Sequence, residues 1–438
     1  MRPIESHQRE GKRERSNSIA ARNCVRVAAR VRHRPPTYMF ASLLLALAAS
    51  PRNSHLGKHV ASVSHPRSAV LAKLGNASSV PAGGAVWPTA IYWAMVQVGT
   101  PPQSFPAAID SGSGDLDIGA VGCVGCVTTP PNRGYDHSAS SSSKPVAPYT
   151  FKNTYETCDL KHPTKPCSIS GKLYQDQVSM AGFGPVAVTV GAIENQDSNF
   201  DQFAEIDGVV GFTSGGGADV FASLVAKGAC DNVWAICMHE GSHSNGTLTL
   251  GGVDSRLAAG PVRYVDDSAS GFHTVNVQTI TLNGTASSAS TSVPVHKRAI
   301  LDTGTNILLL PDPLLKTFGD AMCKDSSLAS CDDLWNNKCV ALTDAQIDAY
   351  PPLSLQLDST SLEMSARDYL LFGSPLASSA DQVCLGIRSG GDLFIIGDTT
   401  MRHYYLVFDL AQGKIGWADV NKGPGGCGSI EEGEAVIA

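Results

Sequence analysis

Short runs of β-branched and aromatic residues, separated by turns, make up most of the chain from about residue 90 onward. The runs are bounded by Gly, Pro, Asn or Asp, which is typical of β-strands and not of helices. The clearest examples are residues 91–98, 186–190, 247–250, 275–280 and 404–408. This pattern predicts an all-β fold.

Helical patterns are few and short. Residues 218–227 and 313–322 are the best candidates, and in the second we expect Asp312 to be the N-cap and Pro313 the first helical residue. The Ser- and Pro-rich segment 134–148 predicts an exposed loop.

One motif occurs twice in the chain. An apolar run ends in Asp110 and continues as Ser-Gly-Ser, and a second apolar run ends in Asp302 and continues as Thr-Gly-Thr. Each copy is followed by an apolar stretch that reaches a glycine, at residues 206–212 and 394–398. The repeat indicates a duplicated lobe, with the junction near residues 255–270.

Composition and charge narrow the class of protein. The 438 residues are enough for two lobes or domains, and 43 Gly and 25 Pro suit an ordered, turn-rich protein. The net charge of −7 conceals a gradient, because residues 1–38 hold 10 Lys and Arg against 3 acidic residues, whereas residues 81–438 hold 19 against 37. The acidic body argues against a nucleic-acid partner.

The N-terminal part is basic and contains one short apolar run. Residues 39–50 are too short to span a bilayer and are typical of the apolar core of a signal peptide. We therefore assign residues 1–50 to a basic leader plus signal peptide, with Met39 as an alternative start, and residues 423–438 to a polar tail. We expect a protein of the secretory pathway, extracellular or in a vacuole- or lysosome-like compartment, with no stable membrane anchor.

Twelve cysteines accompany the signal-like segment. When Cys24 and Cys427 are set aside, the other ten form neighbouring pairs along the chain, which predicts local disulfides in an oxidising compartment. The expected pairs are Cys123–Cys126, Cys158–Cys167, Cys230–Cys237, Cys323–Cys331 and Cys339–Cys384. A redox or zinc role for the first pair is the alternative. Sequons at Asn76, Asn245 and Asn283 are candidate glycosylation sites and agree with secretion.

Two facing turns that carry Asp110 and Asp302 would set two carboxyl groups side by side. Carboxylates about 3 Å apart repel by about 5 kcal/mol at an effective dielectric constant of about 20, so the pair is expected to hold one proton over a wide acidic range. The ionised carboxylate can then act as a general base on water, while the protonated one donates to a substrate carbonyl oxygen. This chemistry hydrolyses a peptide bond with neither a metal nor a covalent intermediate.

The residues beside the two aspartates suit the same chemistry. In each turn the glycine lets the backbone approach the carboxylate and offers it an N–H group. The hydroxyl residue before the glycine can bond across to the other turn, and the one after it can donate to the outer carboxylate oxygen. The predicted supporting residues are Ser111, Gly112, Ser113, Thr303, Gly304 and Thr305.

Longer stretches around these motifs resemble the pepsin-like aspartic proteases over about residues 90–420. The matching segments are 98–103, 250–255, 299–308, 395–398, 402–409 and 414–417. The resemblance implies a bilobal all-β fold with a central cleft between two duplicated β-lobes, 86–260 and 261–422, and the Cys339–Cys384 disulfide in the second lobe. It also implies an aspartic endopeptidase that cleaves polypeptides at acidic pH, made as a zymogen, monomeric, and without a cofactor or metal.

The same resemblance implies a hairpin flap that carries a tyrosine, for which Tyr155 is the best candidate and Tyr149 the alternative. It further implies a basic propeptide at about residues 51–85 that is released in acid. The sequence departs from the family at Gly114, where a hydroxyl residue is usual, and at Asp117, where a tryptophan that supports the flap tyrosine is usual. These departures leave the flap geometry and the pH optimum open.

Two other functions compete with this interpretation. His239-Glu-Gly-Ser-His243 fits the HExxH signature of zinc proteases, but that signature needs a helix, and the Gly, Ser and Asn in and after it indicate a β-hairpin loop. A pepsin-like fold used only for binding or inhibition is the second alternative, and Asp117 is the departure that favours it. Cleavage of any substrate would exclude it.

Overall fold

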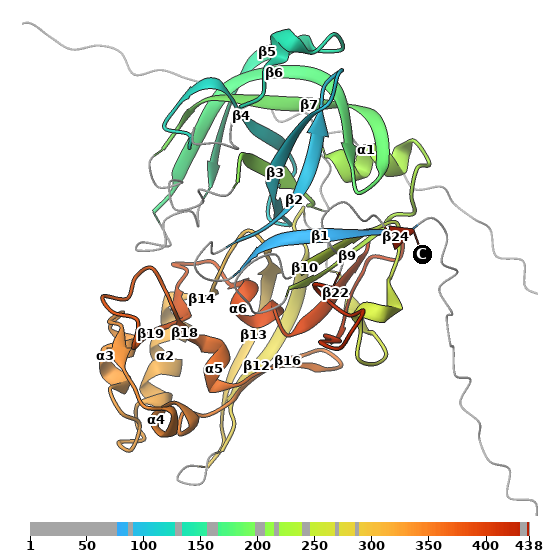
Figure 1. Cartoon of the computed structure of the whole chain (residues 1–438). Coiled ribbons are helices and arrows are strands. Elements are labelled where there is room, and N and C mark those ends of the chain that lie inside the picture. The colour runs from blue at the N-terminus through green and yellow to red at the C-terminus, as the bar shows by residue number, and fades with distance from the viewer. Residues whose placement is uncertain are drawn as a thin grey trace, which may run out of the picture. The chain divides into compact units, whose positions relative to one another are not determined.

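β-Strands dominate the computed structural model (Figure 1), which describes residues 77–85, 91–127, 134–155, 165–197, 206–213, 219–238, 246–267, 271–284, 289–429 and 436–437. These residues all belong to the unit formed by residues 69–438. The predicted signal peptide, Cys158, Asn76 and Asn245 lie outside the described residues.

The larger sheet contains strands from both halves of the chain. Its order is β11–β23–β22–β9–β10–β1–β2–β3–β8–β4–β7–β6–β5, and β24 pairs with β1. Its strands are β1 (Ser78–Ala85), β2 (Ile91–Val98), β3 (Gln103–Asp110), β4 (Leu116–Val124), β5 (Lys144–Tyr155), β6 (Cys167–Met180), β7 (Phe183–Gln196), β8 (Gly208–Gly211), β9 (Val233–Met238), β10 (Gly246–Leu250), β11 (Arg263–Asp266), β22 (Tyr404–Asp409), β23 (Lys414–Asp419) and β24 (Val436–Ile437). Because β22 pairs with β9, one sheet joins the two halves.

Two smaller sheets and short helices complete the second half. The first sheet has the order β17–β16–β12–β13–β21–β14–β20, and the second has the order β15–β19–β18. Their strands are β12 (Thr274–Leu282), β13 (Thr291–Leu301), β14 (Leu308–Leu310), β15 (Val340–Ala341), β16 (Leu353–Leu357), β17 (Ser361–Met364), β18 (Leu370–Phe372), β19 (Gln382–Leu385), β20 (Ile387–Ser389) and β21 (Ile395–Ile396). The helices are α1 (Val220–Ala226), α2 (Asp312–Met322), α3 (Cys331–Trp335), α4 (Asp344–Asp348), α5 (Ala366–Tyr369) and α6 (Asp398–Met401).

The five strand patterns singled out from the sequence all lie in strands, within β2, β7, β10, β12 and β22. In β2 the side chains of Tyr92, Ala94, Val96 and Val98 are buried, whereas Met95 between them is exposed, which is the alternation of a half-buried strand. The helix expected at residues 218–227 is also present as α1, and its N-cap Asp219 accepts a bond from the Phe221 amide. The all-β prediction is therefore confirmed.

The strand that leads into each repeated aspartate lies parallel to an apolar strand from later in its half. β3 ends at Asp110 and pairs with β8, so that Asp110 lies opposite Gly211. β13 ends one residue before Asp302 and pairs with β21, with Leu301 opposite Ile396. The duplication predicted from the sequence is therefore present in the fold, while the boundary between the two lobes stays a prediction.

The start of α2 differs from the prediction by one residue. Asp312 is the first helical residue, and Pro311 occupies the cap position without a side-chain bond. The Asp312 carboxylate accepts a hydrogen bond from the Ser389 hydroxyl instead of capping the helix. This competing partner, 77 residues away, is invisible in the local sequence.

The Ser-rich segment 134–148 is not a simple exposed loop. The hydroxyl groups of Tyr135, Ser140 and Ser142 all donate to the Asp176 carboxylate, at 2.7, 3.0 and 2.6 Å. Tyr135 and Ser140 are buried as a result, and β5 begins inside the segment. The prediction was wrong for Tyr135 and Ser140, because Asp176, which binds both, lies on a different strand, β6.

The disulfides of the structure confirm three of the predicted pairs and contradict one. Cys123–Cys126, Cys323–Cys331 and Cys339–Cys384 are present as expected, and Cys167 is disulfide-bonded. The Cys230–Cys237 pair is wrong, because Cys237 is bonded to Cys427 and the buried Cys230 is free. Neighbours in sequence misled the prediction, since this bond joins residues 190 positions apart. A crosslink that closes so long a loop constrains the unfolded chain strongly.

β1 (Ser78–Ala85) overlaps the segment assigned to the propeptide. Its first five residues pair with β10, from Ser78 opposite Leu250, and its last three pair with β2. Ser79 and Ala82 are buried. The propeptide boundary stays a prediction, and this strand bears on where we place it below.

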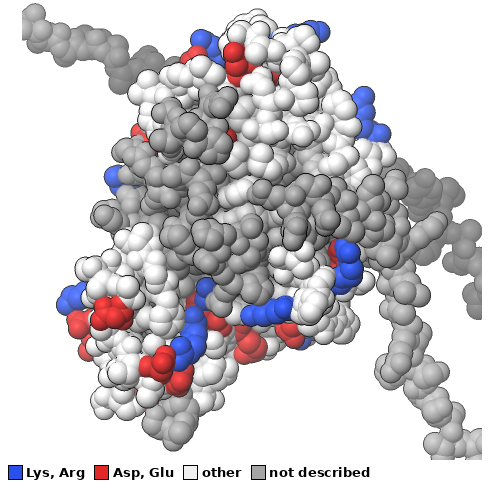
Figure 2. Space-filling view, in the orientation of Figure 1, with Lys and Arg blue, Asp and Glu red and all other residues white. Residues whose placement is uncertain are grey.

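Charged side chains of both signs are spread over the described surface. On the face shown in Figure 2, acidic and basic groups lie next to one another among mainly uncharged residues. Arg367, for example, pairs with Asp344 and Asp348 at 3.0 and 2.9 Å. Of the helices within the described ranges, none has the length and apolar character needed to cross a bilayer.

Candidate active site

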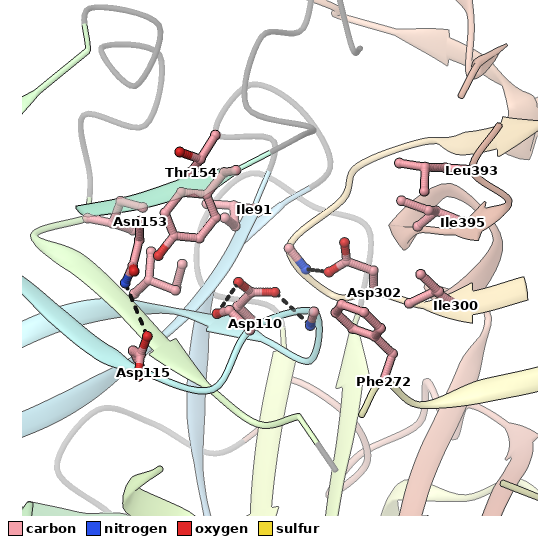
Figure 3. Close-up of a pocket in the computed structure, with 17 residues that line it drawn as sticks. Ile91, Asp110, Asp115, Asn153, Thr154, Phe272, Ile300, Asp302, Leu393 and Ile395 are labelled. Carbon is pink, nitrogen blue, oxygen red and sulfur yellow. Dashed lines mark hydrogen bonds between the residues drawn. The ribbon is translucent and has the colours of Figure 1, made fainter. Parts of the chain in front are cut away.

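A cavity of about 380 Å³ lies where the two repeated turns meet (Figure 3). Asp110 and Asp302 both line it, together with Gly112, Ser113 and Gly304 from the same turns. The other lining residues come from segments on both sides of Asp110 and Asp302, the pair that we call the dyad. These residues are Ile91, Ala108, Asp115, Asn153, Thr154, Tyr155, Ile206, Val209, Phe272, Ile300, Leu393 and Ile395.

The turn after Asp110 surrounds its carboxylate with donors. The Gly112 amide donates to Oδ1 at 2.8 Å, and the Ser113 hydroxyl donates to Oδ2 at 2.5 Å. Asp110 itself is buried, with only 6% of its surface exposed. The turn therefore fixes the orientation of a carboxyl group whose remaining exposed part faces the cavity.

The turn after Asp302 repeats the same arrangement. The Gly304 amide donates to Oδ1 at 2.8 Å, and the Thr305 hydroxyl donates to Oδ2 at 2.7 Å. Two segments almost 200 residues apart thus hold two carboxyl groups by equivalent bonds. The structure brings together all eight residues that the sequence analysis grouped around the dyad.

Four hydrogen bonds lock the two turns to each other. The Ser111 amide donates to the Thr303 hydroxyl oxygen at 3.0 Å, and the Thr303 amide donates to the Ser111 hydroxyl oxygen at 2.9 Å. Each hydroxyl also donates to a carbonyl of the opposite strand, Ser111 to Leu301 at 2.8 Å and Thr303 to Ile109 at 2.6 Å. Ser111 and Thr303 are fully buried, so this link is shielded from water.

The two glycines let the carboxyl groups approach the opposite turn. A Cβ atom on Gly304 would lie 2.6 Å from Asp110 Oδ1, and a Cβ atom on Gly112 would lie 2.7 Å from Asp302 Oδ1. Both distances are shorter than a real contact allows. Each turn therefore needs glycine at this position because the carboxylate of the other turn occupies the space.

Burial and the neighbouring carboxylate of Asp302 raise the pKa of Asp110 above its usual value. The donors from Gly112 and Ser113 act in the opposite direction, but they do not outweigh burial. Two adjacent carboxyl groups in this environment favour a state that holds one proton between them. The proton belongs to the pair and not to one residue.

Asp398, at the start of α6, is a second buried acid close to the dyad. It is fully buried, and neither of its carboxyl oxygens has a hydrogen-bond partner among the described residues. Burial raises the pKa of Asp398 well above its usual value, and the Asp302 carboxylate adds to the rise. A neutral carboxyl group is therefore expected here. The sequence analysis used Asp398 only as part of a motif and gave it no role.

Two further buried aspartates, Asp117 and Asp219, predict that the free energy of unfolding falls as the pH rises. Burial raises the pKa of Asp117 to about 7 and that of Asp219 to about 6. In an unfolded chain an aspartate has a pKa of about 4, so above pH 4 the folded protein holds more protons than the unfolded one. The stability present below pH 4 is therefore lost as the pH rises through 6 and 7.

We expect a decrease of about 1.4 kcal/mol per pH unit for each such proton between pH 4 and the folded-state pKa. Urea unfolding at pH 4.0, 5.5 and 7.0 measures it. A free energy of unfolding that stays constant or rises over this range would contradict the assignment of neutral, buried carboxyl groups.

Tyr155, the predicted flap tyrosine, lines the cavity with the dyad. Its hydroxyl donates to Asp117 Oδ2 at 3.4 Å, and the Asn153 amide donates to the same oxygen at 2.8 Å. The sequence analysis flagged Asp117 as a departure but missed Asn153, for which no sequence signal was available. The alternative, Tyr149, is 59% exposed and does not line the cavity.

Apolar side chains form most of the remaining wall. Ile91, Ala108 and Val209 pack together on the side of the first half. Figure 3 shows Phe272, Ile300, Leu393 and Ile395 on the other side of the dyad. Such a surface suits apolar groups better than charged ones. These lining residues were not found from the sequence, because their segments meet only in the folded protein.

The remaining candidates lie away from the dyad or outside the described residues. Asn283 is half-buried, and its amide donates to Glu363 at 3.5 Å. His239 and His243 lie outside the described residues, between β9 and β10, which pair antiparallel.

Comparison with known proteins agrees with this geometry. A sequence model of the family described as eukaryotic aspartyl protease matches residues 91–420. Pepsin A of Bos taurus is 26% identical over 335 residues, which make up 75% of this chain and 84% of the relative. The pepsins A of Suncus murinus and Sus scrofa are each 25% identical over 335 residues, or 75% of this chain and 81% of each relative. The matched region includes both aspartate turns and every residue that lines the cavity.

Proposed function

Because the chain belongs to the eukaryotic aspartyl protease family and is an aspartic-type endopeptidase, we propose that it hydrolyses peptide bonds at acidic pH through a water molecule activated by Asp110 and Asp302. One observation carries the proposal. Each carboxyl group is held by two donors of its own turn and lies against the glycine of the opposite turn. This arrangement supports a coupled pair of acids facing a single cavity.

The pair would act as both base and acid in one step. With one proton shared, the ionised carboxylate takes a proton from the water, and the protonated one donates to the oxygen of the scissile carbonyl. The tetrahedral intermediate then collapses as a proton passes to the leaving nitrogen. The locked turns support this mechanism because they hold the carboxyl groups in place before substrate binds.

We further propose that the protein is made as a secreted zymogen, with glycosylation at the predicted sequons. The four disulfides within the described residues fit the secretory pathway. The basic residues before the acidic body could pair with it at neutral pH and separate in acid. Since β1 is built into the sheet, we place the cleavage that releases the mature enzyme before Ser78.

Cleavage of an unfolded protein by the acid-treated zymogen, followed between pH 2.5 and 8, tests this function. We expect a bell-shaped pH profile of cleavage with its maximum in acid, and no cleavage at pH 7.5. The rate falls at low pH when the pair of aspartates binds a second proton, and at high pH when it loses the single shared proton. N-terminal sequencing of the activated form should give a residue near 77. Activity that is greatest at neutral pH, or that needs no acid treatment, would contradict the proposal.

A further inference from the structure

A buried histidine that the proposed chemistry does not use joins the two halves of the chain beside the dyad. His273, directly before β12, is fully buried. Its Nδ1 atom lies 2.8 Å from Asp267 Oδ2. Its Nε2 atom lies 2.9 Å from the carbonyl oxygen of Phe212, which directly follows β8 in the first half. The sequence analysis gave His273 no role.

The partners of His273 determine which ring nitrogen carries a hydrogen atom. A carbonyl oxygen can only accept, so the hydrogen bond to Phe212 requires a hydrogen on Nε2. The other nitrogen faces the Asp267 carboxyl group, whose second oxygen accepts a bond from the Thr274 amide at 3.0 Å. Asp267 therefore holds the imidazole ring from its opposite edge and fixes the direction in which Nε2 donates.

Phe212 carries this contact to the backbone of Asp110. Its amide donates to the Asp110 carbonyl oxygen at 2.8 Å, while its own carbonyl oxygen accepts from His273. On the other side, the His273 carbonyl oxygen accepts a bond from the Leu301 amide at 2.9 Å, and Leu301 directly precedes Asp302. Three consecutive hydrogen bonds therefore connect the backbone of Asp110 to the residue before Asp302.

Thr213 makes a parallel connection one residue further along the chain. Its amide donates to the Ser113 carbonyl oxygen at 2.9 Å, in the turn that follows the first catalytic aspartate. Its hydroxyl donates to the carbonyl oxygen of Gly271 in the second half. We call the contacts of Phe212 with His273 and of Thr213 with Gly271 the His273 tie. The tie joins the two halves at two neighbouring points.

The ring of His273 lies among buried aromatic side chains. Its centroid is 4.6 Å from that of Phe408 on β22 and 6.1 Å from that of Trp234 on β9. Asp267 is also shielded from water, with 7% of its side chain exposed. Burying an imidazole and a carboxyl group together is costly even when both are bonded, and an apolar ring would pack here at lower cost. The polar contacts therefore indicate a role beyond packing.

We propose that His273 is a positioning residue for the proteolytic reaction: through its Nε2 bond to Phe212, and with Thr213 beside it, it holds the two halves so that the catalytic carboxyl groups keep a fixed separation. The inference rests on the proposed function, because this separation matters only if Asp110 and Asp302 act together on substrate. His273 is fully buried and does not line the cavity, so it acts through the backbone that it holds and not on substrate.

Two substitutions separate the bond between the halves from the bond to Asp267. His273→Gln places an amide nitrogen close to the position of Nε2 and can still donate to Phe212, whereas His273→Asn places its amide nitrogen close to Nδ1 and can reach only Asp267. His273→Phe keeps a ring but makes neither bond. Thr213→Ala and Thr213→Ser form a second pair, in which only serine retains the hydroxyl. Each variant is compared with the wild type by kcat and KM at pH 4, well below its own midpoint of thermal unfolding.

We expect His273→Asn and His273→Phe to lower kcat about tenfold, as for one lost hydrogen bond, and His273→Gln to stay within about twofold of the wild type. Thr213→Ala should lower kcat about threefold, and Thr213→Ser should restore it. The losses should fall on kcat and not on KM, because the displaced carboxyl groups carry out the chemical step. His273→Asn with wild-type kcat, or His273→Gln as slow as His273→Asn, would overturn the proposal.

Failure of the positioning role and failure of the proposed function give different results. A wild-type protein that cleaves nothing at pH 4 refutes the proposed function, and the positioning role with it. An active wild type whose folded variants all keep its kcat refutes the positioning role alone, even if their midpoints of thermal unfolding fall. If no His273 variant folds, the Thr213 pair decides, because equal kcat in Thr213→Ala and Thr213→Ser would then overturn the proposal.

Discussion

Replacing either Asp302 or Asp110 by asparagine should lower kcat by at least about 10⁴-fold. An asparagine can still accept the amide bond of its turn, so the fold should persist, but it can neither take a proton from water nor share one with its partner. Each single variant removes both the base and the acid of the pair. The double variant should therefore be little worse than either single one.

Cleavage of an unfolded protein at pH 4 by each variant measures this effect, with thermal unfolding as a check on the fold. Asp320→Asn serves as the control, since that carboxylate lies on the surface in an ion pair with Lys316. It should retain full activity. A folded Asp302→Asn variant that cleaves at more than about a hundredth of the wild-type rate would remove the dyad from the mechanism.

Adding one methyl group to Gly304 or Gly112 should lower kcat by about 10²- to 10³-fold. The new Cβ of Gly304→Ala would lie 2.6 Å from Asp110 Oδ1, and that of Gly112→Ala 2.7 Å from Asp302 Oδ1. Relief of either clash moves a carboxyl group away from its partner, and a displacement of about 1 Å is enough for a loss of this size. The effect falls on kcat because the displaced carboxyl groups carry out the chemical step.

Gly260→Ala is the matched control for these variants. A Cβ atom at Gly260 meets nothing within 4 Å, so the substitution should leave the activity unchanged. The three alanine variants are compared by kcat and by their thermal unfolding. Full activity in Gly304→Ala would show that the two turns are farther apart in solution than the structure places them.

The dyad could be predicted from the sequence because its requirements are local. An aspartate that follows an apolar strand, then a hydroxyl residue and a glycine, already contains the donors that hold each carboxylate. The duplication supplied the only long-range information needed, that the two turns would face each other. The bonds between Ser111 and Thr303 follow from that symmetry.

Other features depend on contacts that no local pattern reveals. Cys237 pairs with Cys427 rather than its neighbour Cys230 because the chain end returns to β10, where the Gly428 amide donates to the Thr247 hydroxyl oxygen. Spacing along the chain cannot identify such a partner. The prediction therefore paired the wrong cysteines.

Asp117 shows the same limit next to the cavity. The sequence identified Asp117 as unusual from its position beside the first motif, but its partner Asn153 lies 36 residues away on another strand. Only the pairing of β4, β7, β6 and β5 brings the two side chains together. Sequence reasoning located the departure, and the fold supplied its contacts with Asn153 and Tyr155.

The most direct test of the central claim is cleavage of an unfolded protein at pH 4 by the activated enzyme, measured with pepstatin and, separately, with a zinc chelator. Catalysis by Asp110 and Asp302 predicts that pepstatin abolishes cleavage and that the chelator leaves it unchanged. Loss of cleavage with the chelator alone would contradict the account and move the chemistry to His239 and His243.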